Sequence, residues 1–275
     1  MEEYYFLFGL GFFYTIFAVI QDLKTREISN WLNFSLVSFA LVYRAFYSVI
    51  FSNFKFFSLG ILGFAFFFIL GYIFYYGRVF AGGDAKLLMG FGALLPYKSY
   101  NDILILGLIF IFILFLFGAL WSLLYSINII RKEWKVFKKE FIKRSLLIAV
   151  SVIFFVIFML LGIFIERIMF FIAFFTLALG LLYAYLKAVE KCMIKRKSWE
   201  ELSEGDWLEK DVKIGRNIIK KSVHGLSRED IDTIKKHKKE VYIKEGVPFT
   251  PAFLFALITV FVFLVLLKLD SFFLF

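Results

Sequence analysis

The stretch Arg78–Gly90, RVFAGGDAKLLMG, lies between two of the most apolar parts of the chain. It places an aspartate, Asp84, behind the glycine pair Gly82 and Gly83 and in front of a short apolar run. A carboxylate near membrane depth is costly and is usually functional. The interpretation of the whole chain depends on whether this short run crosses a membrane and on what Asp84 does at its start.

The composition of the 275 residues is typical of a polytopic membrane protein. Hydrophobic residues make up 61% of the chain and the mean hydropathy is +0.83, far above what a soluble domain of this length needs. A single cysteine, Cys192, excludes an internal disulfide and a CxxC zinc site. The two histidines, His224 and His237, have no ligand cluster around them, so we expect neither a metal nor a cofactor.

A membrane-spanning helix needs about 20 largely apolar residues. The acidic start of the chain, MEEYYFLFGLG, differs from a signal peptide, so we expect its apolar run to remain as the first membrane helix. Eight segments are predicted if the short run after Asp84 crosses as a partial or tilted helix. They are Tyr4–Gln21, Trp31–Phe51, Phe56–Tyr76, about Ala85–Leu95, Ile103–Asn128, Leu146–Ile165, Ile168–Leu186 and Phe249–Leu269.

Lysine and arginine mark the cytosolic loops of membrane proteins. Residues 131–144 and 187–246 carry seven and sixteen basic residues, whereas the loops on the opposite side carry few. With eight crossings, every basic loop falls on one side, the cytosol, and both termini fall outside. Without the short crossing, Arg78–Lys86 and residues 131–144 would lie on opposite sides. Membrane topology therefore explains the net charge of +10, and nucleic-acid binding is not expected.

These patterns predict an all-α polytopic membrane protein with about eight membrane helices and a small cytosolic domain inserted before the last helix. Residues 1–186 are predicted to form a membrane core that holds the two candidate aspartates and an extra helical hairpin at about 146–186. Residues 187–246 form the insert, whose size is near the lower limit for an independent core. Residues 247–275 contain the last membrane helix.

The insert has one clear local signal, the stretch SREDIDTIKKHKKE. It is predicted to be a helix, because Ser227 and Asp230 match a capping box and because acids lead and lysines trail. No catalytic constellation is visible in residues 187–246. Docking on the membrane surface, gating of the site and holding of substrate are therefore all left open.

Asp22 and Asp84 differ in setting from the other acids of the chain. Asp22 directly follows FAVIQ at the cytosolic end of the first helix, and Asp84 opens the short fourth helix on the same side. Two carboxylates brought close in a low dielectric share one proton, and such a pair can activate water with one member and protonate a carbonyl with the other. The alternatives are that Asp84 only caps its helix and that Asp22 only marks the interface beside Lys24 and Arg26.

Three segments resemble a known family. QDLKTREISNWLN, residues 21–33, resembles the first motif of the archaeal preflagellin and type IV prepilin peptidases. AGGDAKLLMG, residues 81–90, resembles the second, the GxGD-type motif of intramembrane aspartyl proteases. GVPFTPAFLFAL, residues 246–257, is similar to the proline-containing start of the last helix in the prepilin peptidases. The three motifs stand in the family's order and cover most of the membrane core.

The resemblance implies that Asp22 and Asp84 are the catalytic pair of an aspartic endopeptidase and that Gly83 is the glycine before the second aspartate. The first glycine of the motif would fall at position 81, where this chain has Ala81. We expect Gly82 to supply the flexibility of the backbone one residue later.

The resemblance also implies a substrate, a membrane-inserted preflagellin or type IV prepilin whose short basic leader is cut off at the cytosolic face of the cell membrane. Pro248 and Pro251 would break the start of the last helix and free backbone groups for an extended substrate; alternatively they are ordinary helix-start prolines. Lys86 is expected to tune the pair or only to mark the cytosolic side. The lack of a cysteine-rich domain favours the archaeal branch, and the extra hairpin leaves the choice of precursor open.

Two other classes of function compete with a peptidase. A secondary transporter or ion pathway would use Asp22 and Asp84 as proton or cation sites, but the chain shows no internal repeat and both aspartates lie at one membrane face rather than near the midplane. A non-catalytic membrane anchor would present residues 187–246 to a partner and would make both aspartates incidental.

Overall fold

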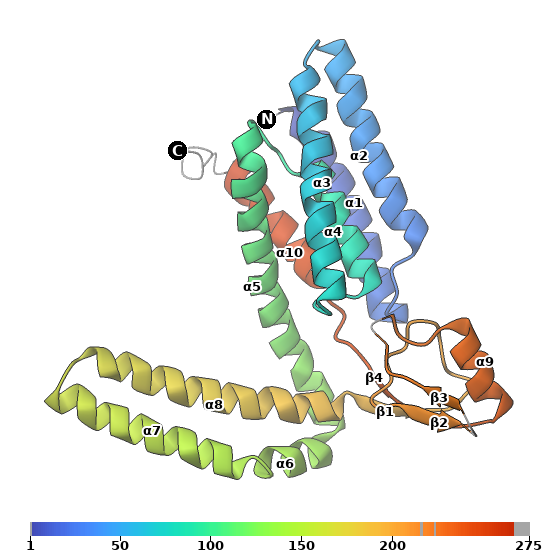
Figure 1. Ribbon diagram of the computed structural model, residues 1–275. Coiled ribbons are helices and arrows are strands. Elements are labelled where there is room, and N and C mark those ends of the chain that lie inside the picture. Colours follow the sequence, from blue (N-terminus) through green and yellow to red (C-terminus); the bar gives the residue numbers. More distant parts are fainter. Residues whose placement is uncertain (1, 215–216, 223, 267–275) are drawn as a thin grey trace. The chain divides into compact units, whose positions relative to one another are not determined.

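The computed structural model describes residues 2–214, 217–222 and 224–266, which Figure 1 shows as coloured ribbons. The chain divides into two compact units. We call Met1–Leu123 with Val247–Phe275 the core unit and Leu124–Gly246 the middle unit. The long helix α5 (Tyr100–Lys132) begins in the first of these and ends in the second.

The helices follow the predicted apolar segments, with bounds that differ by a few residues. The core unit contains α1 (Glu2–Thr25), α2 (Asn30–Ile50), α3 (Phe54–Tyr76), α4 (Gly82–Leu94), the first part of α5, α10 (Thr250–Phe261) and the π-helical turn η1 (Val262–Leu266). The predicted end of the last segment, Leu269, lies outside the described residues.

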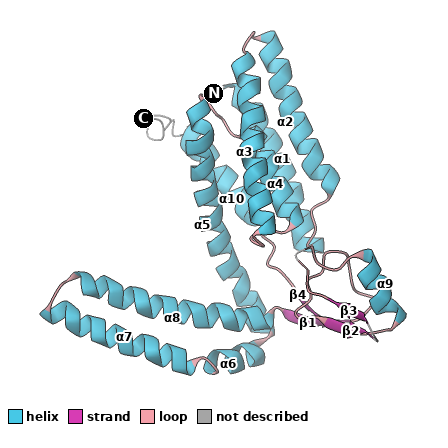
Figure 2. Cartoon of the chain, in the orientation of Figure 1, coloured by secondary structure: helices cyan, strands magenta, loops and turns pink. Residues whose placement is uncertain are grey.

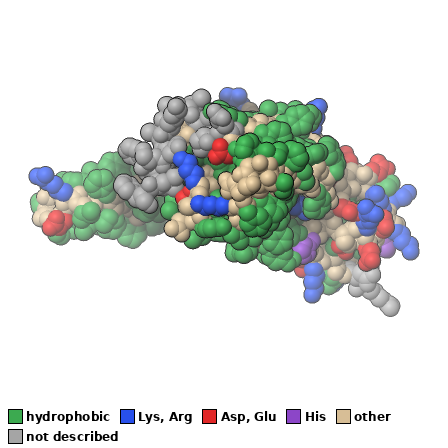
Figure 3. Space-filling model, turned by 90° about the horizontal axis from the view of Figure 1, so that it is seen from above, with side chains coloured by type: hydrophobic (Ala, Val, Ile, Leu, Met, Phe, Trp, Pro, Cys, Tyr) green, Lys and Arg blue, Asp and Glu red, His purple; other side chains and the backbone are tan. Residues whose placement is uncertain are grey.

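Within the described ranges, six helices are long and apolar enough to cross a membrane: α1, α2, α3, α5, α7 (Ser145–Phe164) and α8 (Ile168–Cys192). Many of their hydrophobic side chains are exposed. On α7 only Ser151 and Gly162 are buried. Hydrophobic side chains also form the broad green areas of Figure 3. Apolar surface of this extent fits lipid rather than water, which confirms a helical, multi-pass membrane protein.

The short helix α4 is the most buried helix of the core unit. Most of its thirteen residues are buried, and it packs against α1, α2 and α3. The backbones of α3 and α4 approach closely at Gly63 and Gly92, because a Cβ on either glycine would collide with the carbonyl of the other. The helix ends where Leu95 precedes Pro96, since a residue before proline favours the extended backbone that Leu95 adopts.

A buried arginine holds the C-terminal end of α4. Arg44, within α2, is fully buried and donates hydrogen bonds to the carbonyls of Ala93 (2.7 Å), Leu95 (2.7 Å) and Phe56 (3.0 Å). Two of these carbonyls belong to the end of α4, where helical partners are lacking. Arg44 was not among the predicted functional residues, although a charge within an apolar segment is the signal that would have identified it.

In its described residues, the middle unit contains the end of α5, α6 (Trp134–Ile142), the hairpin of α7 and α8, four short strands and α9 (Arg228–Lys236). Helix α6 lies in a stretch predicted as a loop, and Phe137 packs edge-on against Tyr185 of α8. Strands β1 (Ile194–Lys197) and β4 (Val241–Lys244) pair antiparallel, as do β2 (Val212–Ile214) and β3 (Asn217–Ile219) (Figure 2). These strands correct the prediction of an all-α chain.

Helix α9 forms where the insert was predicted to be helical. The Asp230 amide donates to the Ser227 hydroxyl (3.2 Å) and the Ser227 amide donates to the Asp230 carboxylate (3.1 Å), which completes the predicted capping box. The helix and the strands enclose a small core: Leu202, Leu208, Ile214, Ile219, Leu226, Ile231, Ile234, Val241 and Ile243.

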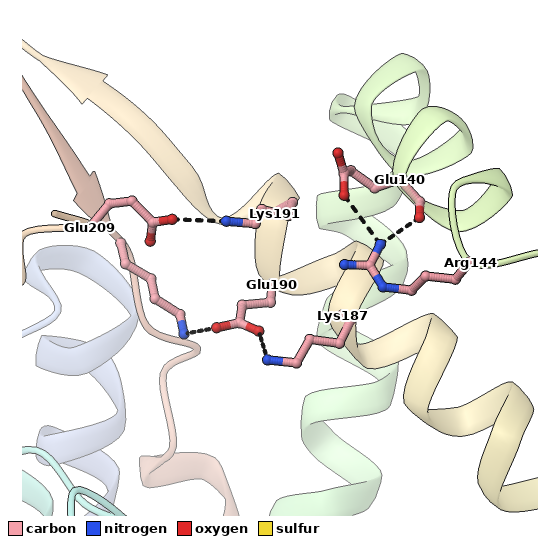
Figure 4. Close-up of polar contacts among 7 residues, drawn as sticks. Glu140, Arg144, Lys187, Glu190, Lys191 and Glu209 are labelled. Atoms are coloured by element: carbon pink, nitrogen blue, oxygen red, sulfur yellow. Dashed lines mark hydrogen bonds and ion pairs between the residues drawn. The ribbon is translucent and has the colours of Figure 1, made fainter. Parts of the chain in front are cut away.

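Ion pairs join the end of α8 to the strand region of the middle unit (Figure 4). Glu190 binds both Lys187 (2.7 Å) and Lys244 (2.7 Å), and Lys191 binds Glu209 (2.8 Å). Helix α8 runs on to Cys192, and strand β1 starts two residues later. The strand region is therefore fixed to the end of α8 rather than joined to it by a free linker.

Candidate functional site

The core unit contains both aspartates that the charge pattern predicts at one membrane face. Asp22 lies in the last part of α1, and Asp84 lies in the first turn of α4. Their carboxylates interact electrostatically. Asp22 is 7% exposed, and Oδ1 of Asp84 is buried with no hydrogen-bond partner among the described residues.

The first turn of α4 determines how Asp84 is held. Ala81 is the N-cap, and Gly82, Gly83 and Asp84 are the first three helical residues. Asp84 is thus not the N-cap, although its carboxylate does hydrogen-bond the backbone of Ala81. A side chain at the third helical position commonly reaches back in this way. Asp84 therefore contributes to the start of the helix without being its N-cap. Such a role does not explain why Oδ1 of Asp84 is buried with no partner among the described residues.

The backbone conformation explains why alanine is accepted at position 81. Ala81 has φ −68° and ψ 162°, an extended conformation that is open to any residue. Gly82 lies in a helical turn, and a Cβ there would make an ordinary contact with Tyr75 at 3.6 Å. A Cβ on Gly83 would lie 3.1 Å from the Cβ of Ile28. The backbone therefore approaches a neighbouring side chain closely at Gly83. Gly82 lies in regular helix and does not form the flexible point that was predicted there.

The connection between α1 and α2 packs against the segment that precedes Asp84. The Gln21 side-chain oxygen accepts hydrogen bonds from the Ser29 amide (3.0 Å) and hydroxyl (2.9 Å), which closes this connection. Ile28, inside it, is buried and faces Gly83. Asn33, one turn into α2, is buried and donates to the Gly83 carbonyl at 3.4 Å. The segment before Asp84 is thus held by groups that follow Asp22 closely in sequence.

Thr250, the first residue of α10, contacts Asp22 directly. Its backbone amide (3.1 Å) and its hydroxyl (2.8 Å) both donate to Oδ2 of Asp22. The amide is one of the unpaired donors at a helix start, and a carboxylate is favoured at that end of a helix. Sequence reasoning missed Thr250 although it lies inside the quoted motif, because its partner is 228 positions away.

The two prolines of this motif have ordinary structural positions. Pro251 stands at the start of α10, where proline is well tolerated. The Pro248 carbonyl accepts a hydrogen bond from the Trp121 indole at 2.8 Å. The Thr250 amide is bound to Asp22, whereas the Pro248 carbonyl, which accepts one hydrogen bond here, keeps a second lone pair. A role of the prolines in substrate binding stays a prediction.

Lys86 joins the starts of two helices. Its ammonium group donates to the Asn30 side chain at 2.6 Å, which ties α4 to α2 rather than binding a carboxylate of the pair. The part of the chain that the structure describes holds no group of three His, Cys, Asp or Glu side chains placed for a metal ion. What the site offers chemically is two interacting carboxylates, which can hold and polarise a water.

Comparisons with known proteins match the same part of the chain. Residues 9–123, which include Asp22 and Asp84, match the type IV leader peptidase family. The preflagellin peptidase of Methanocaldococcus jannaschii is 39% identical over 94 residues, 34% of this chain and 39% of that protein. The preflagellin peptidase of Methanococcus voltae is 33% identical over 93 residues, 34% of this chain and 40% of that protein.

The preflagellin peptidase of Methanococcus maripaludis is 35% identical over 81 residues, 30% of this chain and 35% of that protein. The chain thus matches these relatives over no more than about two fifths of their own length. No solved structure matches the chain. The comparisons confirm the family resemblance for the segment that carries both aspartates.

Proposed function

We propose that this chain, whose residues 9–123 match the type IV leader peptidase family, is a membrane-embedded aspartyl endopeptidase. It removes the short basic leader peptide from preflagellin or a type IV prepilin-like precursor. What supports the proposal is that Asp22 and Asp84, both inside the matched segment, lie close enough for the charge of Asp22 to act on Asp84. The names of the relatives support a precursor of the preflagellin type.

The proposed topology has eight crossings, with α4 and α10 added to the six long helices. The excess of lysine and arginine at 131–144 and 187–246 then lies in the cytosol. Both aspartates lie at cytosolic helix ends, and the middle unit's strand region is the cytosolic insert. A precursor would present its basic leader on that side and its hydrophobic helix within the bilayer.

The proposed reaction is hydrolysis of one peptide bond by general acid–base catalysis. One carboxylate takes a proton from water as the water oxygen attacks the carbonyl carbon, and the other carboxyl gives its proton to the carbonyl oxygen. When the tetrahedral intermediate collapses, the C–N bond breaks. The first carboxyl then protonates the leaving amine, and the second recovers its proton from the intermediate's hydroxyl. Both aspartates return to their starting states.

The test uses the full chain in liposomes with a precursor that has a basic leader and a hydrophobic helix. Asp22→Asn and Asp84→Asn should each abolish cleavage, because neither amide can exchange the required proton. Asp102→Asn is the matched control. Asp102 is also buried, but its carboxylate accepts from the Lys98 (2.8 Å) and Ser99 (2.9 Å) amides before α5, so cleavage should persist.

Cleavage by either aspartate variant at close to the wild-type rate would contradict the proposal. Ion flux in the same liposomes, measured for the wild type and lost in both variants, would instead support the transporter alternative.

A further inference from the structure

We infer that Thr250 is a positioning residue of the proposed active site, holding Oδ2 of Asp22 so that Oδ1 of Asp22 takes the proton from water and Asp84 protonates the scissile carbonyl. This inference rests on the proposed function. It assigns different roles to two carboxylates that the sequence leaves equivalent.

Thr250 donates two hydrogen bonds to one carboxylate oxygen of Asp22. Oδ2 accepts the Thr250 amide at 3.1 Å and the Thr250 hydroxyl at 2.8 Å. A carboxylate oxygen has two lone pairs in its plane, and these two donors occupy them. A proton could bind Oδ2 only by displacing one of these donors. The oxygen of Asp22 that exchanges a proton with water is therefore Oδ1.

The two donors of Thr250 are held rigidly by the residues around them. The side chain is fully buried, and its β-branched carbon restricts rotation about χ1. Phe249, the residue before it, packs against Phe80 with ring centroids 5.0 Å apart and against Gly118 of α5. Pro251, the residue after it, has a fixed φ. The start of α10 thus holds both donors in place before any substrate binds, which is what a positioning group requires.

Asp22 and Asp84 differ in how their carboxylates are hydrogen-bonded. Hydrogen bonds to a carboxylate are strongest when it is ionised, and Asp22 receives two such bonds on a single oxygen. The carboxylate of Asp84 has one contact with the Ala81 backbone, and its Oδ1 is buried without a partner in the part of the chain that the structure describes. The shared proton therefore resides on Oδ1 of Asp84, where it makes that orphan atom a donor for the carbonyl oxygen.

The test compares three variants of the full chain in liposomes. Thr250→Val removes the hydroxyl and keeps the shape and the backbone amide. We expect kcat to fall about 10- to 100-fold, the size of a lost hydrogen bond to a charged group. KM for the precursor should be unchanged, and the acidic limb of the kcat–pH profile should move to higher pH. Thr250→Ser restores the hydroxyl and should recover both the rate and the profile.

Thr259→Val is the matched control, because the Thr259 hydroxyl of the same helix donates to the Phe255 carbonyl away from the aspartates (2.8 Å). It should leave kcat and the pH profile unchanged. If Thr250→Val does not insert, Thr250→Ala replaces it with the same expectation. Wild-type kcat and pH profile in the Thr250 variant, with Asp22→Asn inactive, would overturn the positioning role and leave the proposed function intact. Full activity of Asp22→Asn would overturn both.

Discussion

A Cβ atom added to Gly83 would lie 3.1 Å from the Cβ of Ile28, closer than side chains normally pack. The first turn of α4 therefore rests directly on the connection that follows α1. Because Asp84 comes immediately after Gly83 and Asp22 lies six residues before Ile28, this contact links the positions of the two carboxylates. A glycine is needed there for close approach, and the neighbouring position has no such requirement.

Gly83→Ala should lower the rate of precursor cleavage by about 10-fold, because the added methyl requires a shift of a few tenths of an ångström beside Asp84 and a misplacement of about 1 Å costs about 100-fold. Gly82→Ala is the control, since its added methyl meets Tyr75 only at an ordinary distance, 3.6 Å. Its cleavage rate should stay within about threefold of the wild type, as for other unstrained surface changes. A larger loss for Gly82→Ala than for Gly83→Ala would contradict the geometry.

Arg44→Met should destabilise the folded protein by about 3 kcal/mol or more. The substitution keeps an unbranched apolar stem but leaves the carbonyls of Ala93, Leu95 and Phe56 without the donors that now satisfy them. Thermal unfolding of the chain in detergent measures the effect. Arg167→Met, in the short exposed connection between α7 and α8, should change the unfolding temperature little. Equal stability of both variants would show that Arg44 does not hold α4.

Lys86→Gln separates two roles for this lysine. Its hydrogen bond goes to Asn30 rather than to a carboxylate, so we expect a cleavage rate within about threefold of the wild type and an unchanged pH profile. A pH profile displaced from that of the wild type would instead show that the charge of Lys86 acts on the aspartate pair.

Ser227→Ala should weaken the start of α9 by about 1 kcal/mol, because it removes the hydroxyl that accepts from the Asp230 amide. Amide hydrogen exchange in the first turn of α9, measured in the full chain, should become faster. Thr233→Ala is the control within the same helix, since its exposed hydroxyl donates only to the Glu229 carbonyl one turn earlier (2.8 Å). Similar exchange in both variants would rule out a stabilising capping box.

Features that depend on local composition were predicted well. Long apolar runs have few alternatives to a helix, so α2 was predicted as Trp31–Phe51 and is found at Asn30–Ile50. The charges of the loops, which are visible in the sequence, also place Asp22 and Asp84 at one membrane face, and this stays a prediction.

Features that depend on distant or backbone partners were not predictable. Thr250 meets Asp22 across 228 positions, and no spacing rule connects two such residues. The partners of Arg44 are backbone carbonyls, which any residue type would supply. The strands of the middle unit are three or four residues long, too short for alternation of apolar and polar residues to stand out.

The shortness of α4 has a consequence for how the hydrolytic water arrives. Its thirteen residues rise about 20 Å, roughly 10 Å less than the hydrocarbon thickness of a bilayer. If its Arg44-held end meets the outer boundary, its other end stops well below the cytosolic surface. We therefore expect lipid headgroups and solvent to dip inward above Asp84. Because α4 is shorter than the hydrocarbon layer, water from the cytosol would reach Asp84 without a channel through the helices.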